Sequence, residues 1–348
     1  MKTNFIAFFI IVVTLATSCK TSKTAVAGKH DDLFKKVEKI DDSIRVGDMI
    51  IRNAFKHQIL AHKDGGFDSL VIKNKVYTPN KYVFDTCLSM IFGDASGKKF
   101  ATPGIYDWNR NLLTDHDSLV RAKIAVLDSV NLNSLFTKHL KAVQEITGHK
   151  GKGSWIVYFG PKDFQIFGGC DDNAMVLDMF GDEWNATGIN KVFAHELEHL
   201  VYGSVLKNDV DKETALAAVI DEGLATYFTY IYLKQSREEA LDGKHTQLLM
   251  DNEKLIYNTL KPYFYKTGGD ACPLLRHTGR SNECDFVVNI KGMPNDVANN
   301  LGYFLGFRII EMYVKNHGKD SWKDIYNMPL RQFFEESGYE QYITSKAK

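Results

Sequence analysis

The chain has no excess of charge of either sign. Its 43 lysines and arginines balance 43 aspartates and glutamates over 348 residues. A surface without net charge has no general attraction for nucleic acid or for anionic lipid. We therefore expect no nucleic acid among the partners of this protein.

Long apolar runs are also missing. The segment Phe5–Ala16 is twelve residues long and is interrupted only by Thr14. A membrane-spanning helix needs about twenty apolar residues, so this segment is too short to cross a bilayer, and no other stretch approaches that length. The chain is not expected to be an integral membrane protein.

The N-terminal segment instead has the pattern of an export signal. Lys2 gives a positive start, and the sequence Leu-Ala-Thr-Ser-Cys ending at Cys19 resembles a bacterial lipobox, in which the cysteine becomes lipidated. We predict a lipoprotein signal peptide over residues 1–18, lipidation of Cys19 and a flexible tether over 19–30. The expected location is the bacterial cell envelope, on the periplasmic or surface face, with membrane contact through the lipid. A plain signal peptide is the alternative.

No Cys-x-x-Cys pair is present, so redox catalysis and zinc ligation by cysteine have little support. Beyond Cys19 there are four cysteines, Cys87, Cys170, Cys272 and Cys284. An even number outside the cytosol favours disulfides. Cys272 and Cys284 flank a polar, irregular stretch and form the candidate disulfide, with free buried thiols as the alternative.

The sequence has no internal repeat, and helical patterns dominate it. Apolar residues recur near helical spacing over residues 31–62, where Gly47 weakens the middle. Residues 64–117 are mixed. Further helices are expected at 118–147, with a break near 131–133, and at 189–206, 213–235, 244–266, 297–317 and 329–337. Strands are expected at 154–159 and 173–179. We predict an α+β fold, mainly helical, with an N-terminal region at 31–150 and a second region at 151–343.

The most informative passage is His195-Glu196-Leu197-Glu198-His199, an H-E-x-x-H motif within an apolar run. On a helix, residues four apart lie on the same face, so both imidazoles can reach one ion. Glu196 is turned about 100° from His195 and can act on a water molecule without binding the ion. Two histidines, an open coordination position and a carboxylate are what a zinc hydrolase needs. Chance occurrence in a chain with eleven histidines is the alternative.

A second segment supplies a candidate third ligand. A catalytic zinc ion usually has three protein ligands and one water. Glu222 lies in a second apolar helical pattern, 22 residues beyond His199. A buried, unpaired carboxylate is costly, and a bound cation removes that cost. Asp221 is the competing ligand, but it points about 100° away from Glu222 and is expected to be a surface acid or to support a ligand.

These residues carry a family resemblance over roughly 150–343. The H-E-x-x-H followed by Asp221-Glu222-Gly223-Leu224-Ala225 resembles the gluzincin pattern. The segments Asn300–Phe307 and Glu336–Tyr339 resemble predicted zinc-dependent proteases related to gliding-motility lipoproteins. The resemblance implies a zincin-like metallohydrolase fold, with a small sheet before the H-E-x-x-H helix and an edge strand beside the metal.

The chain also departs from related patterns. Many gluzincins have an Asp four residues after the ligand Glu to orient a histidine, and here that position is Thr226. Asp221 or Asp178 are the candidates for that role. The metzincin pattern requires Gly and His where the chain has Tyr202 and Val205.

Several other residues have a functional and a structural interpretation. Tyr303 is the candidate donor to a developing oxyanion, and a core tyrosine is the alternative; His277 and Arg276 are further candidates. Gly302 and Gly306 are expected to allow close helix packing, with room for substrate as the alternative. The acids in the segment 168–172 could bind calcium, but a simple turn is expected there.

The pattern as a whole predicts a zinc metallopeptidase that takes a peptide or protein substrate and one Zn²⁺ ion. His195, His199 and Glu222 are the expected ligands and Glu196 is the expected general base. The alternative is a non-catalytic envelope lipoprotein that assists secretion or motility on a protease-derived fold.

Overall fold

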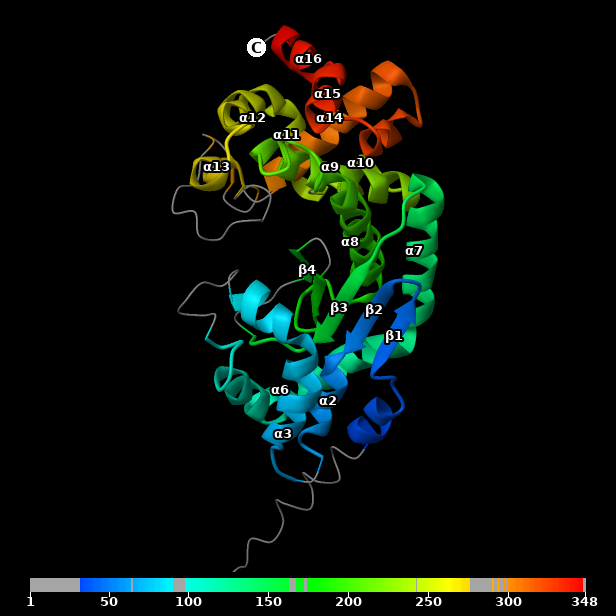
Figure 1. The fold of residues 1–348 in the computed structure, drawn as a ribbon, viewed down its shortest axis with the longest axis vertical. Helices are drawn as coiled ribbons and strands as arrows, with labels where there is room; N and C mark the ends of the chain where they lie inside the picture. Colours follow the sequence, from blue (N-terminus) through cyan, green and yellow to red (C-terminus); the bar gives the residue numbers. More distant parts are fainter. Residues whose placement is uncertain are drawn as a thin grey trace, which may run out of the picture.

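A computed structural model describes residues 32–63, 65–89, 98–162, 167–171, 174–241, 243–275, 290, 293–294, 297 and 300–346. These residues are mainly helical and form one small mixed sheet, which confirms the α+β prediction. The described part is elongated, with the sheet in its lower half and the C-terminal helices in its upper half (Figure 1). No helix in the described part of the chain is long and apolar enough to cross a membrane.

The sheet has five strands in the order β1-β2-β3-β5-β4. Strand β2 pairs in parallel with β3, and β3 with β5, while β1 and β4 are antiparallel to their neighbours. The strands are β1 (Ser43–Val46), β2 (Met49–Asn53), β3 (Gly153–Tyr158), β4 (Phe167–Asp171) and β5 (Ala174–Asp178). The two predicted strands are confirmed as β3 and β5. The turn predicted over 168–172 is wrong up to residue 171, because this segment pairs with β5 as an edge strand.

The single helix predicted over residues 31–62 is also wrong. Residues 32–38 are helical, but β1 and β2 then form a hairpin whose turn includes Gly47 at φ +57°. In β2 the buried and half-buried residues alternate, and this period of two is typical of a strand. The hairpin is stabilised by the pairing of β2 with β3, about a hundred residues away in the chain.

Helices cover both faces of the sheet. Trp155 of β3 packs against Phe136 and Phe193 on one face, with ring centroids 5.1 Å apart in each pair. Ile156 and Tyr158 point to the other face and belong to a separate apolar cluster. The helices on the first face are α7 (Leu132–Thr147) and α8 (Ala186–Leu206). The other face is covered by α2 (Ala54–Leu60), α3 (Ser69–Val71), η1 (Ile72–Tyr77), η2 (Thr78–Asn80), η3 (Val83–Leu88) and α6 (Gly104–Ser129).

The predicted break in the helix over 118–147 is confirmed. Helix α6 ends at Ser129, and Asn131 caps α7 by accepting a hydrogen bond from the Ser134 N–H at 2.9 Å. In the region 64–117, for which the sequence indicated a mixed structure, the described residues lie mostly in short helical segments and in the first part of α6.

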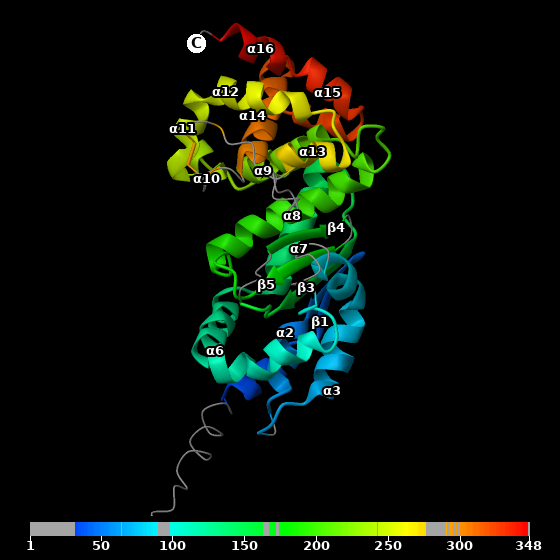
Figure 2. The same ribbon diagram turned by 90° about the vertical axis from the view of Figure 1, so that its left-hand side faces the viewer.

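The C-terminal helices form a second layer beyond α8. Figure 2 shows α8 between the sheet and these helices. At their centre α9 is buried from Ala215 to Thr229, and it packs along α14. The elements are α9 (Ala215–Tyr232), α10 (Arg237–Ala240), η4 (Gly243–His245), α11 (Thr246–Asp251), α12 (Glu253–Leu260), η5 (Lys261–Tyr263), α13 (Gly268–Leu275), α14 (Leu301–His317), η8 (Ser321–Tyr326), α15 (Leu330–Glu336) and α16 (Tyr339–Ser345). The predicted helix over 244–266 is thus divided into short segments.

Candidate metal centre

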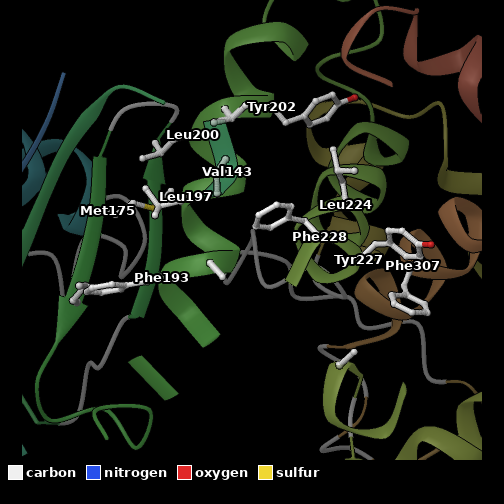
Figure 3. Packing of buried hydrophobic residues seen from close by; sticks show 14 of the residues in the cluster. Val143, Met175, Phe193, Leu197, Leu200, Tyr202, Leu224, Tyr227, Phe228 and Phe307 are labelled. Atoms are coloured by element: carbon white, nitrogen blue, oxygen red, sulfur yellow. The ribbon is translucent and has the colours of Figure 1, made fainter. Parts of the chain in front are cut away.

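Helix α8 presents the H-E-x-x-H motif between two apolar layers. Asn185 caps its N-terminus by accepting a hydrogen bond from the Gly188 N–H at 2.9 Å. Phe193, Leu197 and Leu200 recur at helical spacing and point from α8 toward the sheet (Figure 3). The histidines follow Phe193 and Leu197 by two residues each, so they lie on the opposite face, toward α9.

The structure brings the three predicted ligands together. The Nε2 atoms of His195 and His199 are 3.1 Å apart. Oε2 of Glu222 lies 3.3 Å from Nε2 of His195 and 3.2 Å from Nε2 of His199. The three atoms come from α8 and α9 and form a nearly equilateral triangle.

This triangle has the dimensions of a zinc site. Zinc binds His and carboxylate atoms at about 2.0–2.1 Å in tetrahedral geometry, so ligand atoms are about 3.3–3.4 Å apart. The observed separations of 3.1 to 3.3 Å are slightly shorter, within about 0.3 Å of that spacing. The three residues could therefore hold one metal ion and leave a fourth position open.

Asp221 lies beside the triangle and contacts the other nitrogen of His199. Its Oδ1 is 2.9 Å from Nδ1 of His199. A carboxylate there keeps the proton on Nδ1, which leaves the lone pair of Nε2 directed at an ion. Asp221 is buried, so it is not a surface acid, and its contact with His199 fits the expected supporting role. Asp178, the other candidate, instead accepts hydrogen bonds from the N–H groups of Gly160 and Phe180.

The site holds several buried carboxyl groups. Burial alone lowers the pKa of His199, but the carboxylates of Asp221 and Glu222 raise it well above its usual value. Glu198 is fully buried, and burial raises the pKa of this carboxyl to about 8. Together with His199 and Asp221 it forms a second acidic group with ligand atoms within 4.8 Å. A buried cluster of carboxyl groups favours the binding of a cation.

Glu198 and Tyr326 form a contact that the sequence did not indicate. The Tyr326 hydroxyl donates to Oε1 of Glu198 at 2.7 Å, and both residues are buried. The two residues are 128 positions apart. The sequence shows Glu198 as an acidic residue within an otherwise apolar helical pattern, but no local pattern identifies Tyr326 as its partner.

Glu196 is buried and faces the edge strand β4. A Cβ atom built at Gly168 would lie 3.2 Å from Oε1 of Glu196. The backbone of β4 therefore runs directly beside this carboxylate, and a side chain at position 168 would crowd it. This proximity brings the expected base and an edge strand to the same side of α8.

Tyr303 of α14 also reaches the centre. Its ring stacks near that of His195, with centroids 6.0 Å apart and an interplanar angle of 23°. The tyrosine is partly exposed, so it borders the site and is not a core residue.

Close helix packing positions α14. A Cβ at Gly306 would lie 1.9 Å from the Val219 carbonyl oxygen, and one at Gly223 would lie 2.1 Å from the carbonyl carbon of Gly306. The packing role expected of Gly306 is thereby confirmed. Gly223, which follows the ligand Glu222, is the matching small residue on α9.

Some of the predicted residues lie outside the part of the chain that the structure describes. Residues 1–31, with Cys19, are not described, nor are Arg276, His277 and Cys284. Cys87 and Cys272 are each disulfide-bonded, which agrees with the expectation of disulfides, while the pairing of Cys272 with Cys284 stays a prediction.

Comparison with known proteins gives one family. The family model described as "Predicted Zn-dependent protease (DUF2268)" matches residues 162–335, which is half of the chain and includes α8, α9 and α14. No curated protein and no solved structure matches the chain. By this match, and with a group of residues that could hold a metal at its centre, the chain belongs to this family of predicted zinc-dependent proteases.

Proposed function

We propose that the protein is a zinc metallopeptidase of the gluzincin type on a zincin-like fold. His195, His199 and Glu222 would hold one zinc ion, and Glu196 would act as the general base. The observation that carries this proposal is the triangle of ligand atoms with sides of 3.1 to 3.3 Å.

In this proposal the zinc ion and the side chains of the protein each supply part of the chemistry. Zinc, when bound, polarises a carbonyl and lowers the pKa of its water to about 7. Glu196 accepts a proton from the attacking water and passes it to the leaving amine. Asp221 holds His199 in the tautomer that exposes Nε2. We assign to the Tyr303 hydroxyl the donation of a hydrogen bond to the developing oxyanion, because its ring lies beside His195.

Strand β4 supports a binding mode for the substrate backbone. It pairs with β5 on one side, and no strand in the described part of the chain pairs with its other edge. An extended peptide can add to such an edge through backbone hydrogen bonds. Because Gly168 lies against Glu196, a peptide bound there would pass close to the base.

We also propose that the enzyme works at the bacterial cell envelope, held by a lipid on Cys19, and that it is related to gliding-motility lipoproteins. The support for this is the lipobox-like sequence ending at Cys19 and the resemblance of the segments in the last quarter of the chain.

The substitution Glu196→Gln tests the catalytic claim. The amide keeps the shape of the side chain but cannot accept a proton, so hydrolysis of an unselective peptide mixture should fall by about 10²–10⁴-fold while zinc content stays unchanged. Glu183→Gln, an exposed position just before α8, is the matched control. Near-wild-type turnover in Glu196→Gln contradicts the assignment. A wild-type protein that binds zinc and cleaves no peptide favours the non-catalytic alternative.

A further inference from the structure

A cavity of about 310 Å³ opens beside the metal centre, among α8, α9, α10, α11 and α14. His195 and Tyr303 form the wall nearest the centre. Pockets for ligand groups begin at about this size. If a peptide bond is bound at the candidate metal centre beside His195, the side chain of the adjacent substrate residue can therefore reach this cavity.

Apolar side chains form part of the walls of the cavity, and Asn300 also borders it. Ala240, Leu241, Leu249 and Phe304 line it. The hydroxyls of Thr226 and Thr229 also border it, but each donates to a carbonyl of its own helix at 2.8 Å. Their hydrogens are thus used within α9, and the threonines add no donor for a ligand. The cavity suits a side chain with an apolar body.

Lys191 is the one permanently charged side chain among the described residues that line the cavity. It precedes His195 by one helical turn, on the same face of α8. Its ammonium carries three N–H donors, and it donates to the Glu239 carbonyl oxygen at 2.9 Å. This bond holds the amine between α8 and α10, one turn away from the expected metal ligand.

We infer that this cavity is a specificity pocket, and that Lys191 selects substrate side chains that end in a carboxylate, such as Glu, and to a smaller degree those that end in a hydroxyl, such as Tyr, beside the scissile bond. The inference rests on the proposed peptidase function and names its substrate class. The apolar part of such a side chain would contact the apolar walls of the cavity, and its terminal oxygen would accept a hydrogen bond from the Lys191 ammonium.

Paired peptides test the inference. Two fluorogenic pairs differ only at the residue beside the cleaved bond, Glu against Gln and Tyr against Phe. Zinc-loaded wild-type protein should prefer the Glu peptide over the Gln peptide by about five- to tenfold in kcat/KM, and Tyr over Phe by a smaller factor. In Lys191→Met both ratios should fall to one or below, because the Glu carboxylate and the Tyr hydroxyl lose their partner, and in Lys191→Glu the first ratio should invert.

Lys207→Met, at an exposed lysine just after α8, is the matched control and should keep the wild-type ratios. Leu241→Trp should fill the cavity, reducing cleavage of the Tyr peptide at least about fivefold while an Ala peptide is affected less. Wild-type ratios retained in Lys191→Met, or an absence of preference in wild type, would overturn the inference.

Binding separates this inference from the proposed function. Affinities of the same labelled peptides for zinc-loaded Glu196→Gln protein require no turnover. If the Glu peptide binds to Glu196→Gln more tightly than the Gln peptide but wild type hydrolyses neither, only the peptidase function is contradicted. Hydrolysis without any such preference counts against the pocket alone.

Discussion

At the scale of single residues, the candidate metal centre is a concentration of buried acids. Glu198, Asp221 and Glu222 are all at most 5% exposed, and they face two histidines. Transferring carboxylates out of water costs several kcal/mol each unless they are paired. Glu198 keeps its proton at pH 7, because burial raises its pKa to about 8, and a divalent cation held by the histidines and Glu222 would compensate the charge of Asp221 and Glu222.

Asp178, at the end of β5, is a buried acid away from the centre, and it yields a prediction on pH. Burial raises the pKa of this carboxyl to about 7, against the lowering effect of the N–H groups of Phe180 and Gly160 and of Lys123. The folded state therefore retains a proton that the unfolded chain loses near pH 4. The contribution of this group to stability is fully present below that pH and is lost as the pH rises through about 7.

The substitution Asp178→Asn should remove this dependence. The free energy of unfolding of the variant, relative to wild type, should rise by about 2 kcal/mol between pH 5 and pH 8. Chemical denaturation at the two pH values measures it, with the exposed Asp182→Asn as control. A difference between Asp178→Asn and wild type that stays constant with pH would contradict the assignment.

At the scale of elements, the contact between α9 and α14 sets the position of the site. Gly306→Ala would place a methyl group 1.9 Å from the Val219 carbonyl oxygen, so the helices must separate. We expect a loss of about 1–3 kcal/mol in stability and weaker zinc binding, because Glu222 and Tyr303 lie on these two helices.

Thermal or chemical denaturation and zinc titration measure the two effects of Gly306→Ala. Gly66→Ala, where no atom lies within 4 Å of the added Cβ, should change neither. A Gly306→Ala protein as stable as wild type would show that the helix contact is not as tight as described.

Local patterns predicted the elements that carry the motif. Apolar spacing around His195 predicted α8, and the long apolar stretch around Glu222 predicted α9, which is buried from Ala215 to Thr229. The same reasoning failed at residues 43–53, where Ile44 and Ile51 fit a helical period as well as a strand. Pairing with β3, which is distant in sequence, decides the structure there.

The candidate site was predictable in part for the same reason. The ligand triad follows from the spacing within α8 and from a second buried helix. The contact of Glu198 with Tyr326 and the placement of Lys191 beside a cavity depend on how distant elements pack. No residue near them in sequence carries that information.

At the scale of the whole molecule, the metal centre lies between the sheet with its helices and the C-terminal helices, because α8 contributes two of the expected ligands and α9 the third (Figures 1 and 2). Zinc bound by both helices would stabilise the folded state relative to the unfolded chain. The fold and the proposed activity would then depend on the same ion.

The proposed anchor is also a property of the whole molecule. Cys19→Ser should release the protein from the membrane fraction, because the twelve-residue apolar segment is too short to span a bilayer. A lipoprotein cysteine provides the several acyl chains that stable anchoring needs. The released variant, once folded, should retain its zinc. A Cys19→Ser protein found wholly in membranes after a high-salt wash would indicate an uncleaved signal anchor.

The most direct test of the central claim is the zinc content of purified wild-type, His195→Ala, Glu222→Gln and Asp221→Asn proteins. Wild type should carry about one zinc ion per chain, and His195→Ala and Glu222→Gln should lose it. Asp221→Asn should bind zinc about ten- to hundredfold more weakly, because Asp221 only supports His199. A wild-type protein without affinity for zinc, or an Asp221→Asn protein that loses the metal while Glu222→Gln retains it, would contradict this account.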